Sequence, residues 1–226
     1  MRHMLLLLMF VSLSPFPLRA ADWTLGYEGN EDWSHAFLTA TQPVSRLGEG
    51  DLIAWGSLSY IRYDTFQQGQ SRDVSAPGVG AGVMWRWSNR TSSFAVGPGY
   101  EVRWIDRGVG DRETEGGVTF RGAGHHWMGS SLLFTADGTY YDAIEWTAAR
   151  SSLEYALGDG LRIGPEVAYQ GNGEINVNEI GGILRYPISD VTSVWIRGGT
   201  ARTDLGDGRT RDDPYFSAGI GYTIRR

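Results

Sequence analysis

The amino-acid sequence predicts an all-β protein, a single up-and-down antiparallel transmembrane β-barrel of about twelve strands, with about ten as the fallback. Three observations support this prediction. Apolar residues alternate with polar or small residues along most of the chain, turn residues separate the alternating runs, and a short apolar segment begins the chain. Outside that first segment, no run shows the 3.6-residue period of an amphipathic helix.

The first 20 residues are typical of a secretory signal peptide. Arg2 supplies a positive start, Met4–Leu13 is a short apolar run, and Pro15 follows it. A helix that crosses a bilayer needs about 20 apolar residues, so this run is too short to be one. We therefore expect residues 1–20 to be a signal peptide and residues 21–226 to be the barrel, located in the outer membrane of a Gram-negative cell.

Strict alternation identifies the individual strands. In the run 92–104, Phe94, Val96, Tyr100, Val102 and Trp104 share one face, and small or charged residues occupy the other. The same pattern predicts strands near residues 22–29, 34–42, 52–63, 77–87, 92–104, 127–136, 140–156, 160–170, 177–187, 191–203 and 214–225. A barrel of this kind needs an even number of strands, so one more is expected within 116–124.

The connections between these runs alternate between short and long, as in outer-membrane barrels. Residues 88–91, 158–160 and 189–192 form short turns, whereas 64–76, 105–116 and 204–213 are long and polar. A change of phase within 140–156 predicts a β-bulge there.

The composition of the two faces predicts that the apolar face contacts lipid. The other face consists mostly of Gly, Ala and Ser with sparse charges, which suits a narrow lumen better than the charged exterior of a soluble barrel. Aromatic rings near strand ends are expected at the bilayer interface. These are Trp23, Trp33, Tyr63, Trp85, Trp87, Trp104, Tyr169 and Tyr186.

The lumen phase holds the candidate functional residues. Charged groups in a confined lumen must be paired, and the same groups can bind the hydroxyl groups of a saccharide. The candidates for the lumen or for saccharide binding are Glu101, Arg103, Glu166, Arg162, Arg185, Arg197 and Trp195. We expect Glu166 to contact an Arg of its own or a neighbouring strand, with Arg162 first in sequence, and Pro165 to weaken strand pairing beside it.

The stretch "LRIGPEVAYQGNGEINVNEIGGILRYPISD" resembles the BcsS family of barrel proteins associated with bacterial cellulose biosynthesis. The matching residues are Gly164-Pro165-Glu166, Gly171-Asn172 and a strand that opens near Ile180-Gly181. The resemblance implies an outer-membrane barrel that supports exopolysaccharide production. Its expected partners are outer-membrane lipid, cellulose or another exopolysaccharide, and the cellulose synthase or export machinery.

Two alternative functions stay open, a lipid A-modifying enzyme and a small passive porin. His125-His126 with Ser130-Ser131 contains the residue types of a hydrolase, but adjacent strand residues point to opposite faces. We therefore expect no catalytic residues, no metal site and no cofactor. The negative formal charge of −6 and the absence of cysteine argue against nucleic-acid binding and against thiolate metal sites. The sequence does not distinguish export, anchoring and scaffolding of the polysaccharide.

Overall fold

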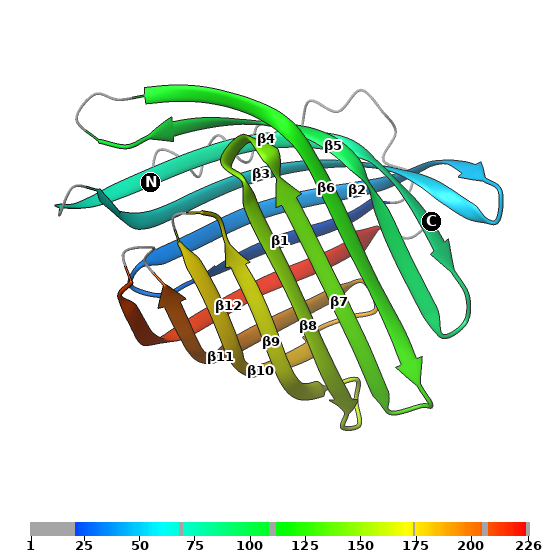
Figure 1. Ribbon diagram of the computed structural model, residues 1–226. Coiled ribbons are helices and arrows are strands. Elements are labelled where there is room, and N and C mark those ends of the chain that lie inside the picture. Colours follow the sequence, from blue (N-terminus) through cyan, green and yellow to red (C-terminus); the bar gives the residue numbers. More distant parts are fainter. Residues whose placement is uncertain (1–20, 68–69, 109–111, 174, 205–207, 225–226) are drawn as a thin grey trace.

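The fold is a closed barrel of antiparallel strands, seen in a computed structural model that describes residues 21–67, 70–108, 112–173, 175–204 and 208–224. Each strand pairs with its neighbours in the chain, and β1 pairs with β12 to close the barrel (Figure 1). The predicted fold class and the count of twelve strands are confirmed. In the described residues, no helix is long and apolar enough to span a membrane. The predicted signal peptide lies outside these residues.

The strands differ in length, from short ones such as β1 to long ones such as β4. Their bounds are β1 (Ala21–Gly29), β2 (Trp33–Leu47), β3 (Gly50–Gln67), β4 (Gln70–Ser88), β5 (Ser92–Asp106), β6 (Arg112–Met128), β7 (Leu132–Tyr141), β8 (Trp146–Ala156), β9 (Arg162–Gly171), β10 (Asn176–Pro187), β11 (Thr192–Asp204) and β12 (Thr210–Ile224). One 3₁₀ turn, η1 (Asp142–Ile144), joins β7 to β8.

The barrel has two distinct ends. The first residue of β1, Ala21, pairs with the last residue of β12, Ile224, and we call this the terminal end. The connections β1–β2, β3–β4, β5–β6, β7–β8, β9–β10 and β11–β12 lie at the opposite end, which we call the loop end. Figure 1 shows the β3–β4 and β5–β6 hairpins projecting at the loop end, at the left of the view.

Two segments predicted as long loops are instead extensions of strands. β3 and β4 pair as far as Gln67 and Gln70, and β5 and β6 pair as far as Asp106 and Arg112. These extensions consist mostly of polar residues, so the alternation of apolar residues does not predict them as strands. Of the acidic loop predicted at 204–213, residues 205–207 lie outside the described residues.

The strand predicted within 116–124 exists as part of β6, but the bulge predicted within 140–156 does not. That run contains the end of β7, the η1 turn and all of β8, with Glu145 in the left-handed conformation at φ 51°. The register of β7 against β8 and of β8 against β9 is constant. The change of phase therefore marks a turn between two strands, and a register shift occurs instead between Pro43 and Ser45 of β2.

Pro165 interrupts pairing as expected, but without forming a bulge. The β8–β9 ladder pairs Ser152 with Glu166 and next pairs Tyr155 with Ile163, so the bridge is lost at the two positions between them while the register stays the same. Proline lacks the N–H group that the ladder needs, which explains this local gap.

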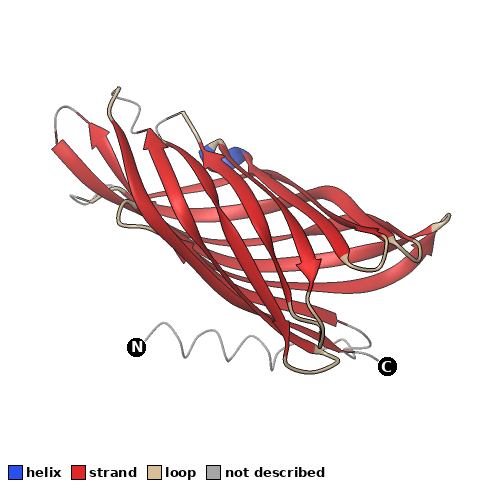
Figure 2. Ribbon diagram, turned by 90° about the horizontal axis from the view of Figure 1, so that it is seen from below, coloured by secondary structure: helices blue, strands red, loops and turns tan. Residues whose placement is uncertain are grey.

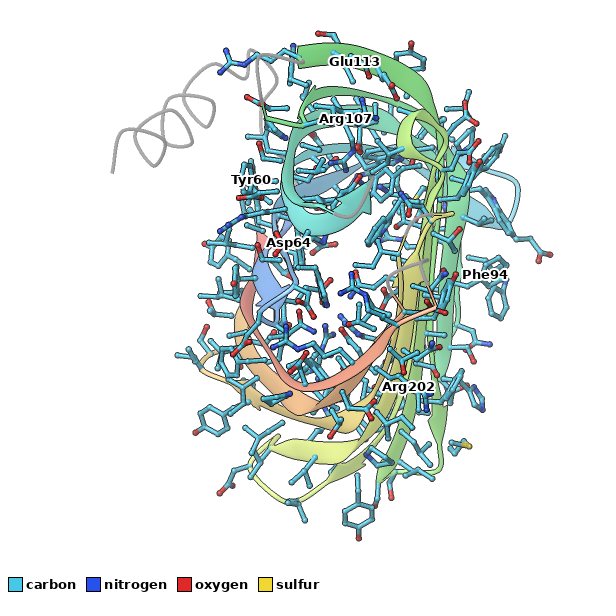
Figure 3. The ribbon with its side chains drawn as sticks, turned by 60° about the vertical axis from the view of Figure 1, so that its left-hand side comes forward. Tyr60, Asp64, Phe94, Arg107, Glu113 and Arg202 are labelled. Carbon is cyan, nitrogen blue, oxygen red and sulfur yellow. The ribbon has the colours of Figure 1, made fainter. Side chains whose placement is uncertain are left out.

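The apolar phase of the strands faces outward, as the sequence predicts. Val96 and Val167 are each 51% exposed, and Figure 3 shows Phe94 pointing away from the barrel. The belt of exposed apolar side chains extends around the wall and includes Leu25, Tyr60, Val79, Val83, Tyr100, Phe120, Phe134, Leu153, Ile163, Ile196, Phe216 and Ile220. Such a belt is the surface that a barrel presents to hydrocarbon.

The largest apolar cluster lies inside the barrel at the loop end, and we call it the apolar layer. It consists of Trp33, Ile61, Tyr63, Val74, Ala76, Ile105, Tyr141, Trp146, Ile175, Val177, Ala201 and Tyr215. Each of these residues is 6% exposed or less. The rings of Tyr63 on β3 and Trp146 on β8 lie 6.0 Å apart, although these strands are separated in the barrel. The layer therefore fills the lumen at this end.

The prediction that Trp33 and Tyr63 lie at a bilayer interface is wrong. They pair with each other across β2 and β3 and both point into the apolar layer. Near the loop end the pattern of these strands is inverted, because the inner face packs the apolar layer while the outer face carries Ser34 and the exposed Arg62. Alternation alone does not identify the lipid-facing side of such a segment. Trp104 and Tyr186, at 48% and 45% exposure, do face outward.

Candidate binding vestibule in the lumen

On the terminal-end side of the apolar layer, the lumen contains a cavity of about 500 Å³. It continues toward the terminal end as a second cavity of about 390 Å³. We call the two together the vestibule. Asp137, Arg185 and Arg197 line both cavities, which shows that they are contiguous. The elongated barrel and its tilted strands are visible in Figure 2. The vestibule therefore contains charged side chains among apolar ones and is bounded by the apolar layer at the loop end.

Arg150 on β8 is the centre of the largest ion-pair network in the lumen. Its guanidinium contacts Glu28 at 2.7 Å, Glu179 at 3.0 Å and Glu166 at 3.3 Å. Glu166 also pairs with Arg197 at 3.0 Å. Because Glu28 lies on β1, this network crosses the lumen and ties separate parts of the wall together.

A second cluster, nearer the terminal end, joins Glu154 to two arginines. Arg185 donates to the Glu154 carboxylate at 3.2 and 3.3 Å, and Arg162 pairs with it at 3.5 Å. Arg162 and Arg185 are directly opposite each other across the β9–β10 ladder. One carboxylate therefore pairs with two adjacent guanidinium groups.

The third cluster lies against β4 and contains Glu101, Arg103 and Arg121. Glu101 pairs with Arg103 at 2.5 Å and lies 3.9 Å from Arg121. Arg121 donates to Ser57 on β3 at 2.8 Å and lies 4.0 Å from the centroid of the Trp55 ring. The Glu101–Arg103 pair is almost fully buried, which suits a role in holding the wall.

Small residues on the lumen phase make room for two tryptophan rings. A Cβ atom at Gly82 would lie 2.7 Å from the Trp55 ring, and one at Gly99 or Gly219 would overlap Trp55 or Trp195 more closely still. Glycine at these positions lets each indole lie against the wall of the barrel. The abundance of glycine on this phase, which the sequence shows, thus has a direct packing explanation.

Several guanidinium groups of the vestibule are partly accessible, beside the exposed Asp137. Side chains of Arg162, Arg185 and Arg121 are 23%, 20% and 14% exposed, whereas those of Glu154 and Glu166 are 0% and 1% exposed. Glu154 and Glu166 therefore lie against the wall beneath the arginines, whereas Asp137 stays accessible. Since guanidinium groups donate but do not accept, this arrangement offers hydrogen-bond donors to a ligand rich in acceptors.

Trp195 lies on the lumen face but does not present an open ring to the cavity. It is 5% exposed, and the guanidinium carbons of Arg185 and Arg197 lie 5.9 and 5.7 Å from its ring centroid. Its indole Nε1 is buried without a hydrogen-bond partner in the described residues. A ligand that enters the vestibule therefore meets the two arginines before the indole.

All of the predicted lumen candidates point inward, but they separate into different clusters. Arg162 does not contact Glu166, because it pairs with Glu154, and the partners of Glu166 are Arg150 and Arg197. The expectation of an arginine contact from a neighbouring strand is thus met by β8. The structure places the candidates in the lumen, and their proposed contact with saccharide stays a prediction.

Sequence reasoning missed Arg150, Arg121, Asp137, Glu28 and Glu154 as vestibule residues. Two of them lie where strand boundaries were misplaced: Asp137 beyond the predicted end of a strand, and Arg150 after the η1 turn. Within β8, Ala148, Arg150, Ser152 and Glu154 alternate regularly. This signal becomes visible once the turn at 142–145 is recognised.

The residue types of a hydrolase do not assemble into a triad in the described residues. His125 lines the terminal-end cavity, whereas His126 bonds to the Ser92 hydroxyl at 2.8 Å. Ser130 and Ser131 lie in the β6–β7 turn and contact each other. The two histidines thus lie on opposite faces, as the strand geometry predicts.

No protein-family model and no curated protein sequence matches the chain. Solved structures do match its fold. An outer-membrane channel from Pseudomonas putida F1 aligns with a TM-score of 0.57 and 9% identity, covering 92% of this chain and 97% of that one. LpxR from Salmonella typhimurium aligns with a TM-score of 0.52 and 10% identity, covering 89% and 99%.

A KdgM porin also aligns, with a TM-score of 0.50 and 11% identity over 90% of this chain and 99% of that one. At these identities the likeness concerns the fold alone. The chain therefore has the fold of outer-membrane β-barrels, a fold that is shared by channels, porins and LpxR.

Proposed function

We propose that the protein is a non-enzymatic outer-membrane barrel that binds saccharide in its vestibule and supports the production or secretion of an exopolysaccharide. The observation that carries this proposal is a vestibule lined by partly exposed guanidinium groups and closed at the loop end. Cellulose is the polymer implied by the resemblance of residues 160–190 to the BcsS family. The outer apolar belt supports residence among outer-membrane lipids.

The closed lumen favours binding over passive diffusion. Residues of the apolar layer are at most 6% exposed, so almost none of their surface contacts water. The layer therefore leaves no wide water-filled passage between these residues. If the terminal end faces the periplasm, as in outer-membrane barrels of this topology, the vestibule opens toward the side on which exopolysaccharide is handled before release. The protein then acts as an anchor or scaffold for the polymer or for its synthase machinery.

Deletion of the gene tests the proposed role most directly. We expect secreted cellulose, measured after acid hydrolysis of the extracellular material, to fall in the deletion strain and to recover on complementation. The mass spectrum of lipid A is expected to be unchanged. Normal exopolysaccharide output combined with altered lipid A would favour the enzymatic alternative instead.

Opening the apolar layer is expected to create conductance. In planar bilayers the unaltered protein should show no steady open-channel current, whereas a Tyr63→Ala/Trp146→Ala variant should conduct, because two rings that meet across the lumen are removed. Trp104→Ala is the matched control, since this ring lies on the outer face. Equal steady currents for all three proteins would support a passive porin.

A further inference from the structure

We propose that Arg162 and Arg185 form a subsite for one oxyanion group carried on a saccharide chain. A uronate carboxylate and a phosphate substituent share the required chemistry. This inference rests on the proposed saccharide-binding function and specifies that the saccharide carries a negative charge. The subsite lies in the terminal-end cavity, which both arginines line.

Besides Asp137, which also lines the cavity, one buried carboxylate, Glu154, balances the charge of the two arginines. They are directly opposite each other across the β9–β10 ladder, where like charges destabilise a sheet. Both pair with Glu154, which is their acidic partner in the described part of the chain. With all three side chains ionised, the cluster carries one net positive charge.

The geometry directs this charge toward the cavity. Glu154 is fully buried, whereas the Arg162 and Arg185 side chains are 23% and 20% exposed. The Arg162 guanidinium lies 5.9 Å from the Trp127 ring and that of Arg185 lies 5.9 Å from the Trp195 ring. Aromatic neighbours at this distance hold the guanidinium groups by cation–π attraction.

The unused donors of the site match an oxyanion. A guanidinium group has five N–H donors in a planar fork that fits carboxylate or phosphate oxygens. Arg162 contacts Glu154 through its Nε, at 3.5 Å, and its two terminal nitrogens have no hydrogen-bond or ion-pair partner in the described residues. The cavity of about 390 Å³ falls within the size range of small-molecule sites, about 300–1,000 Å³. It therefore has room for a sugar unit that carries the anion.

The test compares ligands that differ only in charge. The full-length protein, folded into lipid nanodiscs, is titrated with cellohexaose, with the cellouronate of the same length and with 6-phosphorylated cellohexaose; inorganic phosphate alone is a fourth titrant. We expect at least one charged oligomer to bind more tightly than cellohexaose, and its affinity to fall as salt is added to the unaltered protein. The oligomer that binds identifies the source of the oxyanion.

Variants of the two arginines locate the subsite. Arg162→Gln and Arg185→Gln should each weaken binding of the charged oligomer about tenfold, which corresponds to about 1.4 kcal/mol, since each removes a charge-assisted hydrogen bond. Arg162→Lys should retain more of the affinity than Arg162→Gln. Arg86→Gln is the matched control, because Arg86 pairs with a single acid, Asp51, elsewhere on the wall. Heat-modifiable gel mobility identifies the variants that have folded.

The possible results separate the subsite from the proposed function. Equal, salt-insensitive binding of neutral and charged oligomers would overturn the oxyanion subsite and leave saccharide binding intact. Binding of inorganic phosphate without any oligomer would overturn a subsite for a saccharide-borne group. A lack of binding by all the oligomers would overturn the proposed saccharide-binding function itself.

Discussion

Replacement of Arg150 by methionine is expected to prevent stable assembly of the barrel. Methionine preserves most of the side-chain length but leaves Glu28, Glu166 and Glu179 without their shared cation. Removing one partner from a buried ion pair costs about 3–5 kcal/mol, because the remaining charge is neither solvated nor paired. Folded proteins are stable by only about 5–15 kcal/mol, so a loss of this size is a large fraction of the total.

Refolding into detergent micelles measures this effect through the fraction of protein with heat-modifiable gel mobility and through urea titration. Arg86→Met is the control, since the Arg86 and Asp51 side chains are 29% and 36% exposed and such pairs contribute about 0–1 kcal/mol. Adding Glu166→Gln and Glu179→Gln to Arg150→Met should restore part of the stability. If Arg150→Met folds as well as Arg86→Met, the network does not hold the wall together.

Arginine on the outer face is expected to impair membrane assembly strongly. Val96 on β5 and Val167 on β9 belong to the apolar belt, and each is 51% exposed. If they contact hydrocarbon near the midplane, Val96→Arg or Val167→Arg should cost about 2–4 kcal/mol. The amount of folded protein in the outer-membrane fraction, compared with the unaltered protein, measures the loss.

Gly173→Arg in the β9–β10 connection is the control for this experiment. A Cβ atom at Gly173 meets nothing within 4 Å, so a side chain there has open space. Gly171 is unsuitable, because it is the last residue of β9 and a Cβ there would overlap the Ile175 carbonyl oxygen. Equal assembly of all three arginine variants would show that the apolar belt does not face lipid.

Much of the fold follows from local pattern because of one geometric fact. Successive strand residues point to opposite faces, so a wall with an apolar outside and a polar inside must alternate in sequence. Alternation thereby identified Val96 and Val167 as outward and Glu101, Glu166 and Arg197 as inward. It failed at Trp33 and Tyr63, where the inner face is the apolar one, and in the polar hairpin extensions beyond the belt.

The sequence by itself determined the barrel, its strand number and the phase that faces the lumen, because these depend on neighbours within a strand or on the need for closure. Only the tertiary structure decided that Arg150 bridges β1, β9 and β10, and that Tyr63 meets Trp146 to fill the loop end. Those contacts join strands far apart in the chain, and they depend on how closely the walls approach. The alternation within one strand contains no information about the distance to a strand across the barrel. The pairing of charges and the closure of the lumen therefore appear only once the sheet has curved into a barrel.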